Sequence, residues 1–482
     1  MNINKTIRTC ILTLSAITVI LAGLSSCSDN GYYDLKYPHS SKLPDLPEVG
    51  DIHTYKAPLY WTIYEHALVT DREGISKEDA DFTVEQWAEV MDWIKAELLP
   101  YGYDMICTDG WSVMTAQEGS PYMTHLTTVP IKELVKMAKD RGLRVGIYDN
   151  PMWIHCDDDV KIPGTEYTAG SLLYDKHTDA VEHPKASDKW HKWGLATHPG
   201  AKEWIDGFFK HYSDLGVDMI RIDYLSWYED GTGRIDGITG RGYGRANYAL
   251  CLGYIAEAAK KYGIFTSLVM PHMFNDGELE TKYGNMVRIV CDTWDGGWDF
   301  TSTQHRGLSY GNWPNCENQF DGFTFWNHIT GKGRIIPDGD FTRLNTYETD
   351  EEKETTISLQ LMAGGPIAVA DRPSTMGDNL RFYTNDEILA LNKDRFVGRP
   401  LDTMLDSEGS RIWHGEMSNG DYIVALFNRE DSPAGFKIDL KTFGLDGPMK
   451  VRDLWKHIDE GEASVLEATV AAHGCKVMRL SK

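Results

Sequence analysis

The chain has 482 residues, of which 72 are acidic and 48 are basic, and its formal net charge at pH 7 is −24. Because this balance comes without any block of basic residues, it argues against nucleic acid as a partner. The length exceeds that of one small domain and is sufficient for a large barrel with a companion domain.

The N-terminus has the features of an export signal. Lys5 and Arg8 precede an apolar stretch from Ile11 to Leu24, and Leu-Ser-Ser-Cys ends at Cys27. A basic start, a short apolar middle and small residues before a cleavage point are typical of such signals. Leu-Ser-Ser-Cys resembles the lipobox of bacterial lipoproteins, which implies acylation of Cys27; a plain cleaved signal is the alternative. We expect an exported protein whose membrane attachment is this lipid anchor alone, in the periplasm or on the cell surface.

After this signal, residues 1–27, the sequence predicts a tether and two domains. Residues 28–56 are rich in Ser, Asp and Pro, which suits a tether better than a packed element. Within residues 57–385, short apolar runs recur between segments with helical apolar spacing, such as 129–141, 199–215 and 246–262. The runs are Ala57–Tyr64, Met105–Trp111, Arg144–Asn150, Asp218–Leu225, Ile264–Met270, Met286–Trp294, Arg334–Asp338 and Gly365–Ala370. Eight strands that alternate with helices predict a (β/α)₈ TIM barrel, an α/β fold.

The pattern changes after about residue 385. Residues 410–428 read as two strands around a Ser-Asn-Gly turn, and residues 447–455 and 466–480 add further extended runs. Residues 386–482 therefore predict a C-terminal antiparallel β-sandwich.

Carboxylates follow most of the predicted barrel strands. In a barrel of this kind the functional side chains lie at the C-terminal ends of the strands. Those ends carry Glu65, Asp109, Asp149, Asp223, Asp292 and Asp338. Any one of them could cap a helix, but six around one rim predict a pocket.

Asp223 and Asp292 form the best candidate catalytic pair. Glycoside hydrolysis needs an anion on one side of an oxocarbenium-like transition state and a proton donor on the other. Arg221 lies two residues before Asp223, so both side chains project to the same side of a strand, and a guanidinium would keep Asp223 ionised as a nucleophile. Asp292 follows the stretch VRIVC, which is more apolar than the residues before Asp223, and lies beside Trp294. Desolvation there would raise its pKa and suit it to acid/base catalysis.

The sequence gives no sign of a metal or cofactor site. His155 and His272 stand alone, and the six cysteines after Cys27 are single, without a CxxC pair. The third alternative, a zinc-dependent hydrolase, is disfavoured because this sequence lacks the histidine clusters that bind zinc. We expect carbohydrate as the partner and no cofactor, and the oligomeric state is not predicted.

The order of these motifs resembles the melibiase-type family of α-galactosidases and α-N-acetylgalactosaminidases. The resemblance runs from about residue 57 to the C-terminus. It rests on motifs at the ends of successive strands: Trp61 to Glu65, Asp109-Gly110-Trp111, Gly146-Ile147-Tyr148, Arg221-Ile222-Asp223, Arg288 to Asp292, Pro337-Asp338 and Met362 to Ile367. The resemblance implies a barrel followed by a β-sandwich.

The resemblance also implies a retaining, exo-acting α-glycosidase that releases terminal α-galactosyl-type residues through a glycosyl-aspartate intermediate. Asp223 would be the nucleophile and Asp292 the acid/base, with carboxyls roughly 5–6 Å apart. The residues expected to bind the sugar are Trp61, Glu65, Asp109, Trp111, Tyr148, Arg221, Arg288 and Asp338.

Three departures from the family motifs bear on the substrate. Thr108 replaces the first aspartate of strand two, Arg221 replaces a lysine, and Val269 stands where galactosidases place a glutamate for the C2 hydroxyl. They leave α-N-acetylgalactosaminidase and β-L-arabinopyranosidase specificity open beside α-galactosidase. A surface lipoprotein that binds glycans without catalysis is the further alternative.

Overall fold

The computed structural model of the chain describes residues 36–37, 42–110, 114–116, 120–125, 129–175, 180–181, 191–230, 232–233, 237–238, 242–308 and 315–482. The predicted signal peptide with Cys27, and the predicted sugar-binding Trp111, lie outside this part of the chain. Within it, no helix is both long and apolar enough to span a membrane. The six cysteines it contains are all free thiols.

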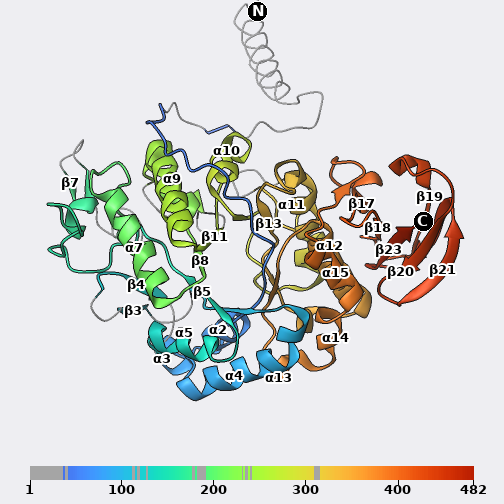
Figure 1. The fold of residues 1–482 in the computed structure, drawn as a ribbon, viewed down its shortest axis with the longest axis horizontal. Helices are drawn as coiled ribbons and strands as arrows, with labels where there is room; N and C mark the ends of the chain where they lie inside the picture. Colours follow the sequence, from blue (N-terminus) through green and yellow to red (C-terminus); the bar gives the residue numbers. More distant parts are fainter. Residues whose placement is uncertain are drawn as a thin grey trace, which may run out of the picture.

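The N-terminal domain is built on a parallel sheet whose strands match the predicted runs (Figure 1). The strands are β1 (Leu59–Thr62), β2 (Met105–Cys107), β5 (Arg144–Tyr148), β8 (Met219–Ile222), β11 (Phe265–Leu268), β12 (Met286–Arg288), β13 (Ile336–Asp338), β14 (Phe341–Thr342) and β15 (Ile367–Val369). They are shorter than the apolar runs because each run continues into the loop at the strand's C-terminal end.

The sheet closes through β13 and β14, which are two halves of one stretch of chain. Arg288 of β12 pairs with Asp338 of β13, and Phe341 of β14 pairs with Ala368 of β15. Since β15 also pairs with β1, the strands return on themselves and form the predicted (β/α)₈ barrel. The seventh strand is therefore longer than expected and is interrupted at Gly339 and Asp340.

Three expected helices are confirmed. They are α5 (Ile131–Lys139), α7 (Ala201–Leu215) and α9 (Gly244–Tyr262). Gly142 follows α5 with φ 81°, and Gly263 caps α9 with φ 70°, a left-handed conformation that suits glycine. The other longer helices of the domain are α2 (Tyr64–Arg72), α4 (Val84–Glu97), α10 (Phe274–Tyr283), α11 (Gln319–Phe325) and α12 (Asp350–Met362).

Alternate residues of the strands serve two separate cores. In β1, Tyr60 belongs to a cluster inside the barrel, with Met105, Met219 and Phe341. Its neighbour Trp61 belongs to the larger cluster between the strands and the helices. This alternation is what a strand of period two requires when both of its faces are buried.

The C-terminal domain is an antiparallel β-sandwich, as predicted. Its larger sheet has the order β16-β17-β18-β23-β20-β21, and β19 pairs with β22 in a second sheet. The strands are β16 (Arg399–Pro400), β17 (Ile412–Glu416), β18 (Tyr422–Phe427), β19 (Ala434–Asp439), β20 (Met449–Asp453), β21 (Ile458–Ala463), β22 (Val465–Val470) and β23 (Cys475–Ser481). Side chains of both sheets share one apolar core. Residues 386–394, expected in the sandwich, instead form helix α15 (Asp386–Asp394), which contacts α12 of the barrel.

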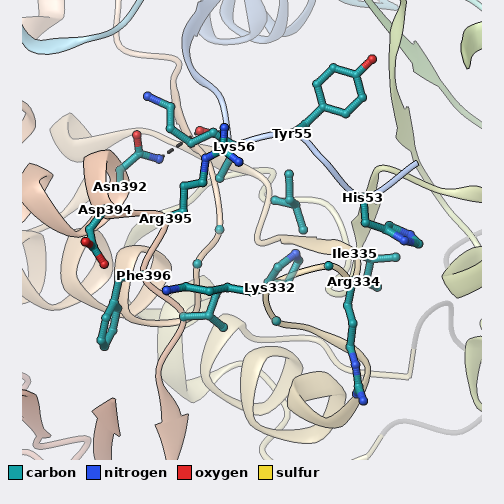
Figure 2. Close-up of a pocket in the computed structure, with 18 of the residues that line it drawn as sticks. His53, Tyr55, Lys56, Lys332, Arg334, Ile335, Asn392, Asp394, Arg395 and Phe396 are labelled. Atoms are coloured by element: carbon teal, nitrogen blue, oxygen red, sulfur yellow. Dashed lines mark hydrogen bonds between the residues drawn. The ribbon is translucent and has the colours of Figure 1, made fainter. Parts of the chain in front are cut away.

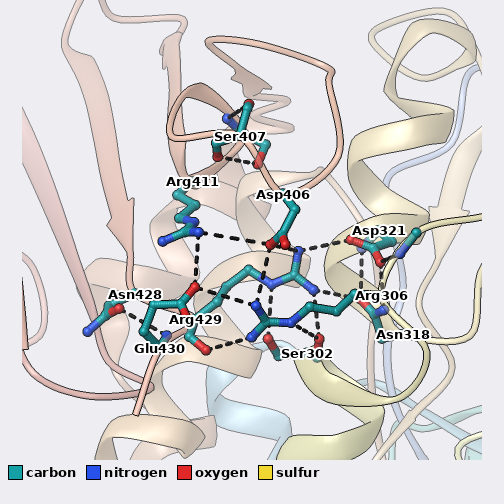
Figure 3. Close-up of polar contacts among 12 residues, drawn as sticks. Ser302, Arg306, Asn318, Asp321, Asp406, Ser407, Arg411, Asn428, Arg429 and Glu430 are labelled. Carbon is teal, nitrogen blue, oxygen red and sulfur yellow. Dashed lines mark hydrogen bonds and ion pairs between the residues drawn. The ribbon is translucent and has the colours of Figure 1, made fainter. Parts of the chain in front are cut away.

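A buried arginine joins the sandwich to the barrel (Figure 3). The guanidinium of Arg429, which is 2% exposed, donates to Asp321 of α11 at 2.9 Å and to the carbonyl of Ser302 at 2.7 Å. Arg306 of the barrel contacts Glu430 beside it at 3.4 Å. Because a buried charge is costly without partners, these contacts fix the position of the sandwich against the barrel.

Residues 42–56, expected as part of a free tether, are docked along the outside of the barrel (Figure 1). Leu43, Leu46, Val49 and Ile52 all pack against the core, and a spacing of three residues places them on one side of an extended chain. The Tyr283 hydroxyl donates to the carbonyl of Pro47 at 2.9 Å, and side chains of α9 and the α10–β12 loop bind two further carbonyls. The proline-rich composition thus belongs to a packed strap.

Candidate active site

Asp223 stands where the chain leaves β8 and turns sharply. Tyr224, the next residue, has a left-handed φ of 61°, which is uncommon for a non-glycine residue. The Asp223 carboxylate accepts the Tyr148 hydroxyl at 2.7 Å and the backbone N–H of Tyr224 at 2.6 Å. Asn150 donates to the Asp223 carbonyl at 2.9 Å. The carboxylate is therefore held in one orientation at the rim.

The charge balance at Asp223 differs from the sequence expectation. Burial raises the pKa of Asp223 above its usual range, while Arg221 and the hydrogen bond from Tyr148 lower it. The expected lowering by Arg221 is present but is outweighed. Arg221 is itself buried, and its guanidinium contacts Asp338 at 3.5 Å and Asp340 at 3.3 Å.

Asp292 lies on the same rim, four residues beyond the arginine that ends β12. Arg288 donates to one oxygen of Asp292 through both terminal nitrogens, at 3.3 and 3.1 Å. The Asp292 side chain is 34% exposed, whereas that of Arg288 is 1% exposed. The surroundings of Asp292 are thus more open and more charged than the apolar run before it suggested, and one side of the carboxyl faces solvent.

Asp338 and Asp340 complete a buried network between the two candidate catalytic residues. Arg288 contacts Asp340 at 2.7 Å through the nitrogen that also reaches Asp292. The second oxygen of Asp340 accepts the backbone N–H of Thr293 at 2.7 Å, directly after Asp292. Asp340 was not among the residues predicted from the sequence, although Asp338-Gly339-Asp340 holds a glycine and a second carboxylate at the point where strand seven breaks.

Asp340 is expected to act as a positioning residue for Asp292. Burial raises the pKa of Asp340 to about 6, although Arg288 and Arg221 oppose that effect. Asp340→Asn weakens the ion pair with Arg288, so kcat should fall roughly 10²-fold with little change in KM, as expected when a catalytic group is misplaced.

The pH dependence of kcat checks the role of Asp340. In the wild-type enzyme, kcat should fall as the pH drops below about 6, because Asp340 is then protonated. That component should be missing from the variant's profile; an unchanged profile would show a purely structural role.

Four other predicted sugar-binding residues are all buried. Tyr148 is 5% exposed and holds Asp223, and Asp109 after β2 is 4% exposed. Both oxygens of Glu65 are occupied by protein donors: Asn345 and Arg343 bind one, and Thr375 and the backbone N–H of Arg372 bind the other. Trp61 is fully buried and packs edge-on against Trp87 of α4. No face of its ring is open in this structure.

The two arginines and Asp338 are likewise buried. Arg221, Arg288 and Asp338 are each at most 2% exposed, and both guanidinium groups form ion pairs with Asp338 across β8, β12 and β13, at 3.5 and 4.0 Å. Their contacts orient the rim from below. Asp149, the remaining rim carboxylate, is also buried and accepts the Tyr212 hydroxyl at 2.8 Å.

Aromatic rings gather on the Asp223 side of the rim. The rings of Trp153 and His191 are stacked, with their centroids 3.9 Å apart. The centroid of the Tyr224 ring lies 5.9 Å from that of Trp153 and 4.4 Å from that of Trp227. Tyr148 is 5.9 Å from Trp153. Such rings offer flat apolar faces with polar edges, which suit the carbon face of a sugar.

The residues that depart from the family motifs are built into the scaffold. Thr108 is fully buried, and its hydroxyl accepts the backbone N–H of Tyr148 at 3.1 Å. Val269 is also fully buried, in a small apolar cluster with Trp227 and Met270. Neither side chain offers a charged acceptor where the family motif has a carboxylate.

No group of three or more His, Cys, Asp or Glu residues suited to a metal ion occurs in the part of the chain that the structure describes. His155 and His191 form a hydrogen-bonded pair at 3.2 Å, and His272 pairs with Asp230 at 2.9 Å. The chemistry available at the rim is that of two carboxylates and the groups that orient them.

Comparison with known proteins identifies the family. Residues 407–480 match the alpha galactosidase C-terminal beta sandwich domain. An isomalto-dextranase of Arthrobacter globiformis is 36% identical over 457 residues, which cover 88% of this chain and 67% of that protein. The chain belongs to the melibiase-type family. An α-galactosidase of Oryza sativa subsp. japonica is 22% identical over 430 residues, or 87% of this chain and 84% of that one.

Solved structures of other melibiase-type enzymes share the fold. The A. globiformis isomalto-dextranase complexed with panose aligns with a TM-score of 0.79 and 34% identity, over 92% of this chain and 76% of that chain. An α-galactosidase from Mortierella vinacea aligns with a TM-score of 0.63 and 16% identity, over 89% of this chain and 98% of that chain. The second likeness shows the fold alone.

Membership of the melibiase-type family makes the protein a retaining α-glycoside hydrolase. The expectation of an enzyme is confirmed, which removes the alternative of a glycan-binding protein without catalysis.

Proposed function

We propose that the enzyme hydrolyses α-glucosidic linkages in glucans of the dextran type, acting from chain ends, with Asp223 as nucleophile and Asp292 as acid/base. The single observation that carries the choice of sugar is the likeness to isomalto-dextranase, at 36% identity over 88% of the chain, against 22% for the rice α-galactosidase. Dextran is an α-(1→6)-linked glucose polymer, so its hydrolysis needs the same pair of carboxylates.

The scaffold residues support a departure from galactoside specificity. A site built to hydrogen-bond a hydroxyl discriminates strongly against substrates that lack it, whereas an apolar site discriminates weakly. The buried Thr108 and Val269 cannot serve as the charged acceptors that the galactosidase motif supplies. Galactoside specificity remains the second candidate, because Asp109 is kept at the end of β2, where the family has an aspartate.

Attachment to the cell envelope is part of the proposal. A lipid on Cys27, in Leu-Ser-Ser-Cys, would hold the enzyme at a membrane surface where polymer fragments arrive. The strap of residues 42–56 packs on the barrel, so the connection between lipid and enzyme would be short.

A substrate panel tests the proposed sugar. We expect kcat/KM for an aryl α-isomaltoside to exceed that for the aryl α-galactoside by at least about 10²-fold. Galactose is the C4 epimer of glucose, and a site that hydrogen-bonds the hydroxyls of a glucosyl ring discriminates strongly against a ring whose hydroxyl is misplaced. Aryl α-N-acetylgalactosaminide and β-L-arabinopyranoside complete the panel, and NMR of the released sugar follows the anomer. An α-galactoside that reacts faster than the isomaltoside would overturn the glucan proposal and restore the galactoside.

A further inference from the structure

Two segments that follow neighbouring strands lie together beside the candidate nucleophile. They are residues 224–229, which include α8 (Leu225–Glu229) after β8, and residues 269–274 after β11. The backbone N–H of Ser226 in the first segment donates to the carbonyl of Met270 in the second at 2.7 Å. We call the two segments together the rim wall.

The rim wall carries a ring at the catalytic rim and the side chains that support it. Tyr224 is partly exposed and packs against the apolar cluster of Trp227, Val269 and Met270. Val269 stands where the galactosidase motif has a glutamate for the C2 hydroxyl. The position of the rim wall therefore bears on which sugar fits beside the nucleophile.

Arg245, in the first turn of α9, links both segments of the rim wall from behind. Its side chain is 1% exposed and donates to a carboxyl oxygen of Glu229 at the end of α8. It also donates to the carbonyl of Phe274 at 3.3 Å and to Glu278 of α10 at 3.0 Å. Because a guanidinium presents its donors in a fixed planar geometry, this one side chain holds the two segments in register.

The second segment depends on such support. Met270 and Met273 have left-handed φ values of 57° and 59°. Non-glycine residues keep this conformation only where their surroundings hold them in it. Besides the contact of Arg245 with Phe274, the His272 ring pairs with Asp230 directly after α8 at 2.9 Å.

Tyr37 covers the outer side of Arg245. The guanidinium carbon lies 5.7 Å from the centroid of the Tyr37 ring, and the Tyr37 N–H donates to the side chain of Asn275 at 3.1 Å. The strap of residues 42–56 reaches the opposite end of the barrel, where His53 and Lys56 help to line a cavity of about 240 Å³ (Figure 2). The N-terminal chain thus contacts both ends of the barrel, with Tyr37 at the rim end.

We propose that Arg245 is a positioning residue that fixes the rim wall and thereby the fit of the sugar beside Asp223. The inference rests on the proposed role of Asp223 as nucleophile. Asp223 is also held from outside the rim wall, because Tyr148 donates to its carboxylate and Asn150 to its carbonyl. A displaced rim wall should therefore change the fit of the substrate more than the chemical step.

Arg245→Met tests the proposal on two substrates, the aryl α-isomaltoside and the aryl α-galactoside. KM for the better substrate should rise at least about tenfold while kcat changes less than about threefold, because a binding surface is displaced and the nucleophile is not. The ratio of kcat/KM between the two glycosides should fall at least about tenfold, since a displaced site rejects the wrong epimer less well. The ratio is defined whichever glycoside the wild type prefers, so failure of the glucan proposal leaves this test intact.

A double variant, Arg245→Met with Glu229→Leu, separates positioning from stability. Replacing a buried ion pair with apolar side chains is often neutral or stabilising, so this variant should keep the wild-type Tm while KM and the ratio shift as in Arg245→Met. Glu257→Gln, which removes a surface ion pair with Lys202 from the same helix α9, is the matched control and should change neither parameter. A folded double variant with wild-type KM and ratio would overturn the proposal, and so would a fall in kcat at constant KM.

Tyr37→Ala probes Arg245 without altering the buried ion pair. We expect KM to rise about two- to fivefold at unchanged kcat, because the guanidinium loses its cation–π contact. If the Arg245 variants do not fold and Tyr37→Ala keeps the wild-type KM and ratio, Arg245 serves folding alone and the proposal is wrong.

Discussion

Replacing Asp223 with asparagine is expected to lower kcat roughly 10⁴-fold or more, because the covalent intermediate can no longer form. The amide keeps the shape of the carboxylate and its contact with the N–H of Tyr224. Asp218→Asn is the matched control, since it lies at the other end of the same strand, where it accepts the N–H of Val145 at 3.0 Å. That variant should keep its rate within a factor of about two, as expected of a residue that makes no contact with the reacting atoms.

Asp223→Asn should leave the fold intact and the free energy of unfolding equal or slightly higher. Burial raises the pKa of Asp223, so the folded state favours the protonated carboxyl more than the unfolded chain does. That preference stabilises the protein in acid and is lost as the pH rises through the folded pKa, so the ionised group is a cost at neutral pH. Thermal unfolding at pH 7 should therefore show an equal or higher Tm for Asp223→Asn. A lower Tm with normal turnover would show that Asp223 is structural.

Asp292→Ala should separate substrates by their leaving groups. For an isomalto-oligosaccharide, whose leaving alcohol needs a proton, we expect kcat/KM to fall about 10²–10⁴-fold. For a dinitrophenyl glycoside, whose leaving group needs none, the loss should be much smaller. Steady-state rates on the two substrates check this, and equal losses on both would exclude the acid role.

Asp295→Ala is the control for this experiment. Asp295 lies three residues further along the same loop, has a side chain that is 79% exposed, and pairs with Arg72 on the surface. Surface ion pairs contribute little, so this variant should behave like the wild type. A loss as large as that of Asp292→Ala would point to the loop's conformation as the cause.

The barrel could be predicted because its strands are buried on both faces and so appear as continuous apolar runs. Glycines at left-handed positions, such as Gly263 after α9, marked the ends of helices. The motif order placed Asp223 and Asp292 at the rim, where the structure has them. The sandwich was predictable from the Ser-Asn-Gly turn, which the structure places between β17 and β18.

The contacts of the site could not be predicted from the sequence. Arg221 lies beside Asp223 in the chain, yet its ion pairs are with Asp338 and Asp340 across the barrel. Asp340 enters the site only because strand seven breaks at Gly339 and re-pairs with β15, which depends on closure of the whole sheet.

The strap was missed for a different reason. Its apolar residues recur every third position, from Leu43 to Ile52, a period that fits neither a helix nor a strand. The prolines around them favour an extended chain, which is equally typical of a free linker and of a packed segment. The structure identifies a packed segment because these residues fit against the surface of α9 and α10, and that fit is not visible in the sequence.

The measurement that tests the catalytic assignment most directly is peptide mapping after trapping of the glycosyl-enzyme. The enzyme is incubated with a 5-fluoro-α-glucosyl fluoride, which slows hydrolysis of the intermediate, and the digested protein is analysed by mass spectrometry. A single added fluorosugar on the peptide that contains Asp223, absent from Asp223→Asn, is the result we predict. A sugar attached to Asp292, or inversion of the anomeric centre without any trapped intermediate, would contradict it.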